Sequence, residues 1–384
     1  MAEKKLVPEL RFPGFEGEWE STTLGDIGSF SKGRGISKAD IDPEGVLECI
    51  RYGELYTTYS EVIDDVKSRT SVDTQELVLS QGNDVIIPAS GESQIDIATA
   101  SCVLKDGVAL GGDLNIIRTS LNGIFLAYYL NNKKKQEIAS LAQGISVIHL
   151  YSNQLKTLLI NVPSTEEQRK IAFFLTTIDE HIQLLEKKKK SLERYKKGVM
   201  QKIFSQEVRF KDDDGKDFPD WEKKKIIEIA PLQRGFDLPN SEISEGPYPV
   251  VFSNGILKYH NVYKIQGPGV VTGRSGTIGK VTFVKGNYWP HNTSLWVTNF
   301  FINDPKFIYY FYLNVKLDRY NAGSTVPTLN RNDVHSLKKS IPSLLEQQKI
   351  ASFLSAFDNS IDQVDRQLIR VKEYKKGLLQ KIFV

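Results

Sequence analysis

The sequence is poor in the features that mark secreted and membrane-embedded proteins. Its 384 residues include only two cysteines, Cys49 and Cys102, which cannot form a disulfide framework. No apolar run reaches the roughly 18 residues that a membrane-spanning helix requires. The N-terminal residues also lack the apolar core of a signal peptide. We therefore expect a cytoplasmic protein, and the chain is long enough for two or three domains.

Recognisable catalytic and cofactor-binding motifs are also absent. The segment 273–280 resembles a phosphate-binding loop, but it has five residues between the outer glycines where the motif has four. Val281 stands where that motif needs a Ser or Thr to bind Mg²⁺. The five histidines are scattered, without the spacing of metal ligands. We therefore predict a binding protein with no catalytic residue, metal or cofactor of its own.

The sequence does contain a tandem duplication. The segment 163–204 recurs without a gap as 342–383, and 19 of the 42 aligned positions are identical. The shared motifs are Glu-Gln-x-Lys-Ile-Ala-x-Phe-Leu and Tyr-Lys-Lys-Gly-x-x-Gln-Lys-Ile-Phe. The segment 9–19 is echoed by 207–221, so the entry to each domain is repeated as well. Such self-similarity indicates a repeated structural unit.

Each copy of the duplicated segment predicts one long helix. Ser164 and Glu167 match the capping box that begins a helix. Ser343 and Glu346 repeat it in the second copy. Apolar residues then recur in heptads, and 17 of the 20 seam positions are apolar, which favours a coiled coil between the two helices. Two separate amphipathic helices, each docked on its own domain, are the alternative. The seam prediction rests on Ile171, Leu175, Ile178, Ile182, Leu185, Ile350, Leu354, Phe357, Ile361 and Val364.

The regions before the two helices carry short strand-like runs separated by turns, such as residues 84–91 and 269–276. Each region also has one aromatic-rich helical stretch, which we expect to pack in its core. The predicted fold class is therefore α+β, with two α/β domains in tandem, each followed by a long helix. The predicted boundaries are domain 1–163, helical spacer 164–205, domain 206–342 and helical spacer 343–384.

The doubled motifs resemble those of the DNA-specificity subunit of type I restriction–modification systems, over the whole chain. The resemblance implies that each domain is a target recognition domain that reads one half of a split, asymmetric DNA sequence. It implies an antiparallel coiled coil between the domains. It also implies partners: double-stranded DNA, two modification subunits that methylate adenine N6, and two restriction subunits that are ATP-driven motor–nucleases. S-adenosylmethionine, ATP and Mg²⁺ would be bound by those partners, and the chain itself would have no active site.

Two recognition domains joined by one rigid spacer are expected to read half-sites separated by unread bases, because docking geometry fixes half-site spacing. One added turn in both helices would separate the domains by about 5–6 Å, or about two base pairs. One alternative is a coiled-coil scaffold with two protein-binding domains and no DNA specificity. A self-contained methyltransferase or nuclease is a second alternative, which the missing motifs disfavour.

Candidate DNA contacts follow from side-chain chemistry, because Arg reads guanine bidentately and small residues allow close approach. The net charge of only +3 gives no bulk signal for nucleic acid, so contacts would come from local patches. Residues 187–190, four lysines, could contact phosphates between the half-sites. An ordinary surface role is the alternative for each candidate. The predicted DNA-binding residues are Lys32, Arg34, Arg51, Tyr52, Ser90, Arg234, Lys258, Tyr259, Arg274, Ser275 and Asn292.

Overall fold

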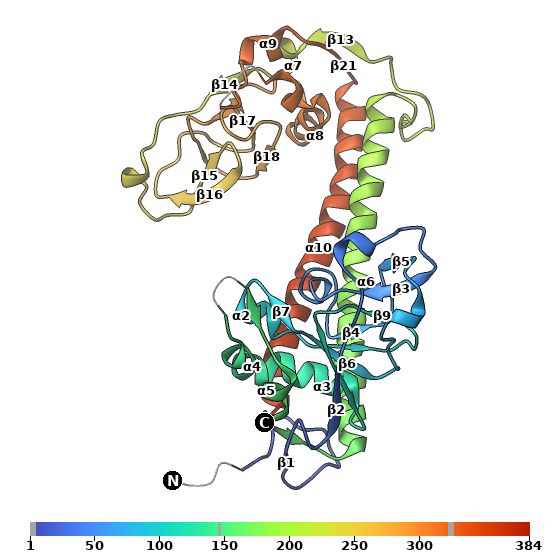
Figure 1. Cartoon of the computed structure of the whole chain (residues 1–384). Coiled ribbons are helices and arrows are strands. Elements are labelled where there is room, and N and C mark those ends of the chain that lie inside the picture. The colour runs from blue at the N-terminus through green and yellow to red at the C-terminus, as the bar shows by residue number, and fades with distance from the viewer. Residues whose placement is uncertain (1–4, 145–146, 322–325) are drawn as a thin grey trace. The chain divides into compact units, whose positions relative to one another are not determined.

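The computed structural model describes residues 5–144, 147–321 and 326–384 (Figure 1). The chain forms two compact units. The first consists of Met1–Glu186 with Arg366–Val384, and the second of Lys187–Asp365. The long helices α6 (Thr165–Phe204) and α10 (Leu344–Ile382) each contribute one part to both units.

A five-stranded sheet of order β2-β10-β6-β8-β4 forms the centre of the first unit. Its neighbouring strands are antiparallel except β4 and β8. A three-stranded sheet, β5-β3-β9, has β3 and β9 parallel. The strands are β1 (Glu20–Thr23), β2 (Gly28–Lys32), β3 (Leu47–Ile50), β4 (Val62–Ile63), β5 (Ser68–Thr70), β6 (Asp84–Pro88), β7 (Ser90–Gly91), β8 (Ser101–Val103), β9 (Ala109–Leu110), β10 (Leu114–Thr119), β11 (Ile148–His149) and β12 (Leu159–Val162). The helices before α6 are α1 (Glu54–Thr57), α2 (Gln94–Ile97), α3 (Gly123–Tyr129), α4 (Lys135–Leu141) and α5 (Ser152–Lys156).

The second unit repeats this plan with one strand fewer in its central sheet, β14-β20-β17-β18. Its three-stranded sheet is β16-β15-β19, and β15 and β19 are again parallel. The strands are β13 (Glu222–Lys225), β14 (Leu232–Arg234), β15 (Tyr248–Phe252), β16 (Gly255–His260), β17 (Gly269–Gly273), β18 (Val281–Val284), β19 (Trp289–Pro290), β20 (Ser294–Val297) and β21 (Lys338–Ile341). The helices before α10 are α7 (Ile226–Ile229), α8 (Pro305–Val315) and α9 (Arg331–Ser336).

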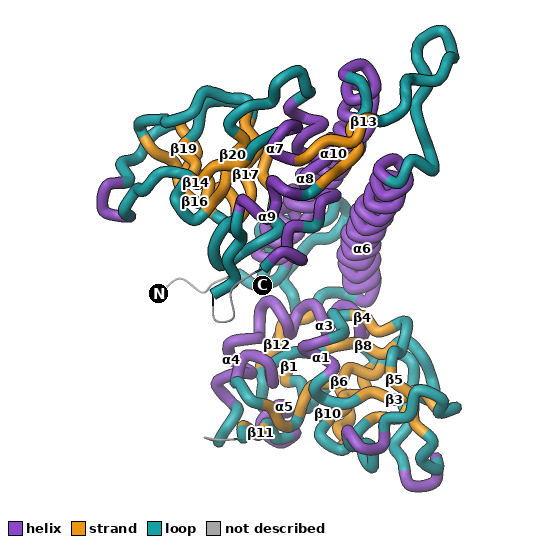
Figure 2. The backbone as a smooth tube through the Cα atoms, turned by 90° about the horizontal axis from the view of Figure 1, so that it is seen from above, coloured by secondary structure: helices purple, strands orange, loops and turns teal. Residues whose placement is uncertain are grey.

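One aromatic-rich helix lies in the core of each unit, as the sequence predicts. Helix α3 packs against β6 and β8, and α8 packs against β17 and β18 (Figures 1 and 2). Each begins at a side chain that accepts a backbone hydrogen bond, Asn122 from Phe125 (2.9 Å) and Asp304 from Phe307 (2.7 Å). The cap fixes where the helix starts, so its phenylalanine and tyrosine rings enter the core, where they are buried.

The helices α6 and α10 run antiparallel within each unit. In the first unit, Lys375 pairs with Asp179 at 2.6 Å and Lys372 with Glu186, also at 2.6 Å. In the second unit, α6 and α10 pair at Lys189 and Asp365 (2.5 Å) and again one heptad further along. The residue numbers fall along one helix as they rise along the other, which defines the antiparallel direction.

The predicted seam faces both the other helix and the domain. Eight of its ten residues are buried, and Phe357 and Ile361 are partly buried. Ile178 and Ile182 of α6 pack with Leu378 of α10, as a coiled coil requires. Ile171 and Leu175 belong instead to the large core of the first unit. The coiled coil and the alternative of helices docked on their domains therefore describe different stretches of the same helices.

The capping-box prediction is wrong for the second helix and half right for the first. Ser164 Oγ accepts a hydrogen bond from the Glu167 backbone (3.3 Å), but Ser343 Oγ has no partner within the described ranges. The glutamates are used differently, because each is buried and binds an arginine from the segment that enters its unit. Glu167 binds Arg11 at 2.7 Å, and Glu346 binds Arg209 at 2.8 Å. The repeated entry segment thus anchors the start of each long helix.

No helix in the described part of the chain is long and apolar enough to span a membrane. Within the same residues, His, Cys, Asp and Glu side chains form no group of three or more that could hold a metal ion.

Candidate nucleic-acid interface

The two units share a backbone framework at the ends of their central strands. Strands β2, β10, β6 and β8 of the first unit correspond to β14, β20, β17 and β18 of the second in order and direction. Three pairs of backbone hydrogen bonds recur at corresponding places. They are Gly33 N to Leu114 O and Gly235 N to Ser294 O (both 3.0 Å), Arg34 N to Leu110 O and Phe236 N to Pro290 O (both 2.8 Å), and Gly111 N to Ile50 O and His291 N to Val251 O (both 2.9 Å).

A glycine is required at the same place in both frameworks. A Cβ atom on Gly33 would lie 2.1 Å from the carbonyl oxygen of Gly111. A Cβ atom on Gly235 would lie 2.3 Å from that of His291. Only glycine allows such a close backbone approach. Lys32 and Arg234, two of the predicted contact residues, therefore occupy equivalent positions, each directly before the glycine at which two backbone segments approach closely.

Next to the close approach of Gly33 and Gly111, the first unit has a hollow of about 570 Å³. Arg51 lies at its edge with its guanidinium 3.8 Å from Glu54, and Arg51 Nε has no hydrogen-bond partner in the described part of the chain. Several glycines leave the backbone uncovered, which suits close approach by another polymer. The hollow is lined by Gly35, Ile36, Ser37, Lys38, Arg51, Tyr52, Gly53, Gly111, Gly112 and Asp113.

The corresponding hollow of the second unit has a volume of about 340 Å³ and different chemistry. Asp237 accepts hydrogen bonds from Arg234 (2.7 Å) and from the Asn292 side chain. Lys258 of β16 donates to the Asn240 side chain (2.9 Å). These bonds hold long polar side chains in one arrangement before any ligand arrives. The lining residues are Asp237, Leu238, Pro239, Asn240, Phe252, His291 and Asn292.

The structure distributes the eleven predicted contact residues unevenly. Of the first unit's five, Arg51 and Tyr52 line the hollow, Lys32 and Arg34 are exposed beside it, and Ser90 is only 6% exposed on β7. That burial leaves the Ser90 side chain little surface for DNA.

The candidates in the second unit gather more closely. Arg234 and Asn292 meet at Asp237, and Arg274 Nη1 donates to the Asn292 carbonyl oxygen at 3.4 Å. Lys258 reaches the same hollow through Asn240, whereas Tyr259 is exposed on β16 and Ser275 forms a backbone bridge with Thr328. The role of each candidate in DNA binding stays a prediction.

Sequence reasoning missed Asp237, the acidic residue that binds Arg234 and Asn292 at the second hollow. Asp237 lies three residues after Arg234, a spacing that could have suggested the pair. The hydrogen bond from Asn292 is the main cause that lowers the pKa of Asp237, so its carboxylate stays charged and keeps its two donors. His291 packs on the Phe252 ring with centroids 4.3 Å apart, and burial lowers the pKa of its imidazole. A neutral imidazole at pH 7 offers one donor and one acceptor.

Two regions of the chain match the same family model. The model describes the type I restriction modification DNA specificity domain, and it matches residues 16–194 and again residues 219–373. The chain belongs to this family. The resemblance inferred from the doubled motifs is therefore confirmed, and so is the predicted fold class of two α/β domains in tandem, each followed by a long helix. Membership implies a role in DNA sequence recognition.

Relatives of the specificity family align along nearly the whole chain. The type I restriction enzyme MjaVIII specificity subunit of Methanocaldococcus jannaschii is 23% identical over 98% of this chain and 93% of its own length. The crystal structure of an S subunit from a type I restriction–modification system of M. genitalium matches with a TM-score of 0.68 at 17% identity, covering 98% of this chain and 99% of that one. A chain from a structure of a type I R-M system matches with a TM-score of 0.55 at 16% identity, covering 97% of each. At these identities the solved structures establish the shared fold.

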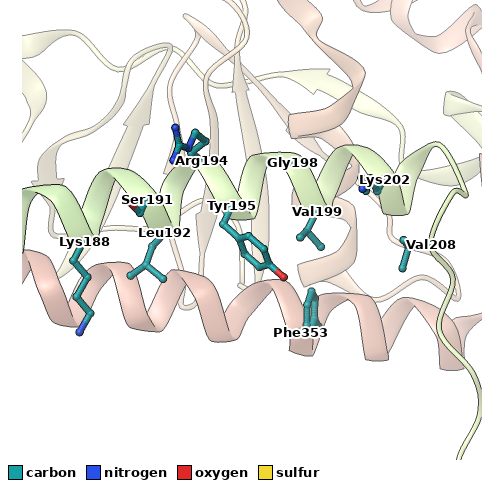
Figure 3. A pocket seen from close by; sticks show the side chains of 10 residues that line it. All are labelled: Lys188, Ser191, Leu192, Arg194, Tyr195, Gly198, Val199, Lys202, Val208 and Phe353. Carbon is teal, nitrogen blue, oxygen red and sulfur yellow. The ribbon is translucent and has the colours of Figure 1, made fainter.

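The helices of this specificity subunit carry a second surface feature, in the second unit. A groove of about 880 Å³ follows α6 beside α10. Figure 3 shows Leu192, Tyr195 and Val199 pointing from α6 toward α10, where Phe353 points back. Tyr195 is 60% exposed, although the centroid of its ring lies 5.5 Å from that of the Phe357 ring. An exposed aromatic residue among aliphatic ones, with Lys188, Arg194 and Lys202 at the edges, is typical of a protein-binding surface.

Proposed function

We propose that this chain is the sequence-reading subunit of a type I restriction–modification complex, with each unit reading one half of a bipartite, asymmetric DNA target. One observation carries the proposal. The two units place equivalent hollows on one backbone framework, yet line them with different side chains. A shared framework suggests a shared type of ligand, duplex DNA. Different linings suggest different base sequences, because base edges are distinguished by the donors and acceptors opposite them.

The side chains in the hollows suit base edges in the major groove. In the second unit, Arg234 and Asn292 are held by Asp237, and arginine and asparagine are the usual partners of guanine and adenine. In the first unit, Arg51 and Lys38 supply donors beside the open glycine backbone. The lysines of residues 187–190 lie on α6 between the two recognition regions in sequence, so they would contact phosphates of unread base pairs.

We further propose that α6 and α10 set the gap between half-sites and bind two modification subunits, one on each unit. The groove along Leu192, Tyr195 and Val199 supports this. At the equivalent positions of the second copy, α10 carries Val371, Tyr374 and Leu378, and Tyr374 is 56% exposed. Leu378 is buried against Ile178 and Ile182, so the exposed residue that the two copies share is the tyrosine. Two copies of one exposed tyrosine would fit two copies of one partner. The modification subunits would bind S-adenosylmethionine, and two restriction subunits would bind ATP and Mg²⁺. The chain itself would be non-catalytic and would work in the cytoplasm.

The test is single-molecule methylome sequencing of cells with and without this chain, with its modification subunit present in both. The proposal predicts that deletion removes adenine methylation at one split motif and leaves all other methylated motifs unchanged. Purified complex should also bind duplexes containing that motif in a salt-dependent way, because phosphate contacts release counterions. An unchanged methylome together with salt-insensitive binding would contradict the proposal.

A coiled-coil scaffold that binds only proteins is the second candidate, and the exposed groove beside Tyr195 is the observation that favours it. Tyr195→Ala distinguishes the two. In a scaffold, the substitution would abolish binding of the partner protein, and the chain would bind no DNA with or without the substitution. The specificity subunit would lose one of its two modification subunits while the isolated chain still bound DNA.

A further inference from the structure

The non-apolar positions of the helical seam are explained by ion pairs across it. The seam has apolar residues at 17 of 20 heptad positions, and the three exceptions are Lys189, Lys196 and Lys375. Each reaches an aspartate on the other helix within its own unit: Lys189 reaches Asp365, Lys196 reaches Asp358, and Lys375 reaches Asp179. Polar residues in an apolar seam lower stability but specify which alignment forms. These lysines therefore fix the pairing of the helices.

In the first unit, the cross-helix pair also binds the recognition domain. The Tyr128 hydroxyl on α3 donates a hydrogen bond to Asp179 on α6. Lys375 of α10 lies 2.6 Å from the same carboxylate and 5.2 Å from the centroid of the Tyr128 ring. Glu61, just before β4, lies 3.8 Å from Lys375. One aspartate thus connects the domain helix and both long helices.

The second unit contains the same cluster with the helices exchanged. Tyr310 on α8 donates to Asp358 on α10, and Lys196 of α6 pairs with that carboxylate and lies 5.1 Å from the Tyr310 ring centroid. Where the first cluster has Glu61, this cluster has a basic residue, Lys306, which lies 3.9 Å from Asp358. The aspartates of the two clusters occupy equivalent positions in the two copies of the duplicated segment, and so do the lysines. The tyrosines precede the duplicated segments, so the contact recurs although the domains that supply it have diverged.

We propose that these two Tyr–Asp–Lys clusters, Tyr128–Asp179–Lys375 and Tyr310–Asp358–Lys196, are the positioning residues that fix the orientation of each recognition domain on the helices and thereby the number of unread base pairs. The proposal rests on the proposed function.

The physical basis is the kind of contact that each cluster makes. Apolar packing between a domain and a helix is non-directional and tolerates small rotations. A charge-assisted hydrogen bond between partly buried groups is directional and short in reach. A domain that rotates slightly about its helices moves a distant reading surface by much more than the atoms at the joint. Other directional contacts of each domain lie at the starts of the long helices, where the backbone N–H groups of Asn122 and Asp304 donate to Gln168 and Gln347. A joint that loses its cluster would therefore pivot about that end and allow neighbouring gap lengths.

The first part of the test measures the joint itself, within the second unit and without DNA. Spin labels at Ser241→Cys in the domain and Gln363→Cys on α10 report their distance distribution in the full chain. Tyr310→Phe removes only the hydroxyl, and Asp358→Asn removes the charge. We expect both to broaden the distribution while the chain stays folded. The control is Lys189→Gln, which breaks the cross-helix pair with Asp365 in the same unit but touches no domain tyrosine, and it should change nothing. An unbroadened distribution in both variants would overturn the proposal.

The second part measures gap preference in the complex with the modification subunit. Competing duplexes carry the two half-sites of the wild-type motif separated by n−1, n or n+1 base pairs. The wild type should prefer n by at least about tenfold, the size of a mismatch penalty. The Tyr310→Phe and Tyr128→Phe variants should prefer it by less than about threefold, with unchanged half-sites. A broadened joint with an unchanged preference would refute the positioning role. A wild type with no preferred gap would refute the proposed function and leave the result on the joint intact.

Discussion

Lengthening α6 and α10 together is the most direct perturbation of the proposed spacer. Extra residues can be placed after Glu186 in α6 and after Asp365 in α10, where the chain passes from one unit to the other. Seven residues in each helix preserve the heptad phase of the seam, whereas four shift it by part of a turn. Neither insertion changes a residue of the hollows or of the Tyr–Asp–Lys clusters.

The expected magnitude follows from helix geometry. Seven residues at ~1.5 Å each add about 10 Å, or about three base pairs at ~3.4 Å. Four residues add about 6 Å, or about two base pairs. These are upper values, because only the component of the helix axis along the DNA counts. Each added base pair also turns the distant half-site by roughly 35° around the duplex, since a turn contains about 10 base pairs. We therefore expect a longer gap together with slower methylation.

The assay is methylome sequencing of cells that carry the wild type, the four-residue or the seven-residue variant. If the paired helices set the spacing, cells with any of the three chains should methylate the same two half-sites, and the gap should grow with the number of inserted residues. Insertion in α6 alone is the control, because unmatched residues must loop out of the pair and should leave the gap unchanged. If both paired insertions methylate at the original gap, the helices do not set the spacing.

Three further predictions concern single residues in the second unit. Arg209→Ala should lower the free energy of unfolding by about 3 kcal/mol, because it leaves the buried carboxylate of Glu346 without its cation; denaturant unfolding measures this, and a change near zero would contradict it. Asn292→Ala should relax one position of one half-site, a loss of about 1–3 kcal/mol of discrimination, and leave the other half-site unchanged in the methylome. Burial lowers the pKa of His335, whose Nε2 accepts from the Leu232 backbone, so its contribution to stability is present above pH 6.5 and is lost as the pH falls below it. Urea unfolding at pH 7.5 and 5.5 should show this loss, and His335→Gln should show less of it.

The sequence was sufficient to predict the parts of the fold that repeat. The heptads and the gapless duplication predict two paired helices, because a seam must recur every seven residues to stay buried. The sequence was insufficient for the helix starts. The capping-box pattern at Ser343 and Glu346 is local, but the buried glutamate is bound by Arg209, 137 residues earlier in the chain. A tertiary ion pair displaced the local hydrogen bond, and no local pattern reports such a partner.

The candidate DNA contacts also include features that the sequence indicates and features that only the folded chain brings together. Arg234 was recognisable, since arginine reads guanine bidentately. Its connection to Asn292 through Asp237 was not, because β20 brings residue 292 beside the end of β14 only in the folded sheet. Ser90 is the opposite case, since its residue type fits a DNA contact but its side chain is only 6% exposed on β7.

Stability and the proposed specificity rest on different residues in this fold, and the separation has a physical consequence. The residues that hold each unit together, such as Glu167 and Asp179 in the first, are buried or partly buried and bind charged partners, so replacing them is costly. Residues in or beside the hollows, such as Asp237 and Arg234, are exposed, and substitutions at exposed positions usually change stability by less than about 0.5 kcal/mol. The lining of a hollow can therefore change while the framework stays folded. This explains how one duplicated scaffold can carry two differently lined hollows.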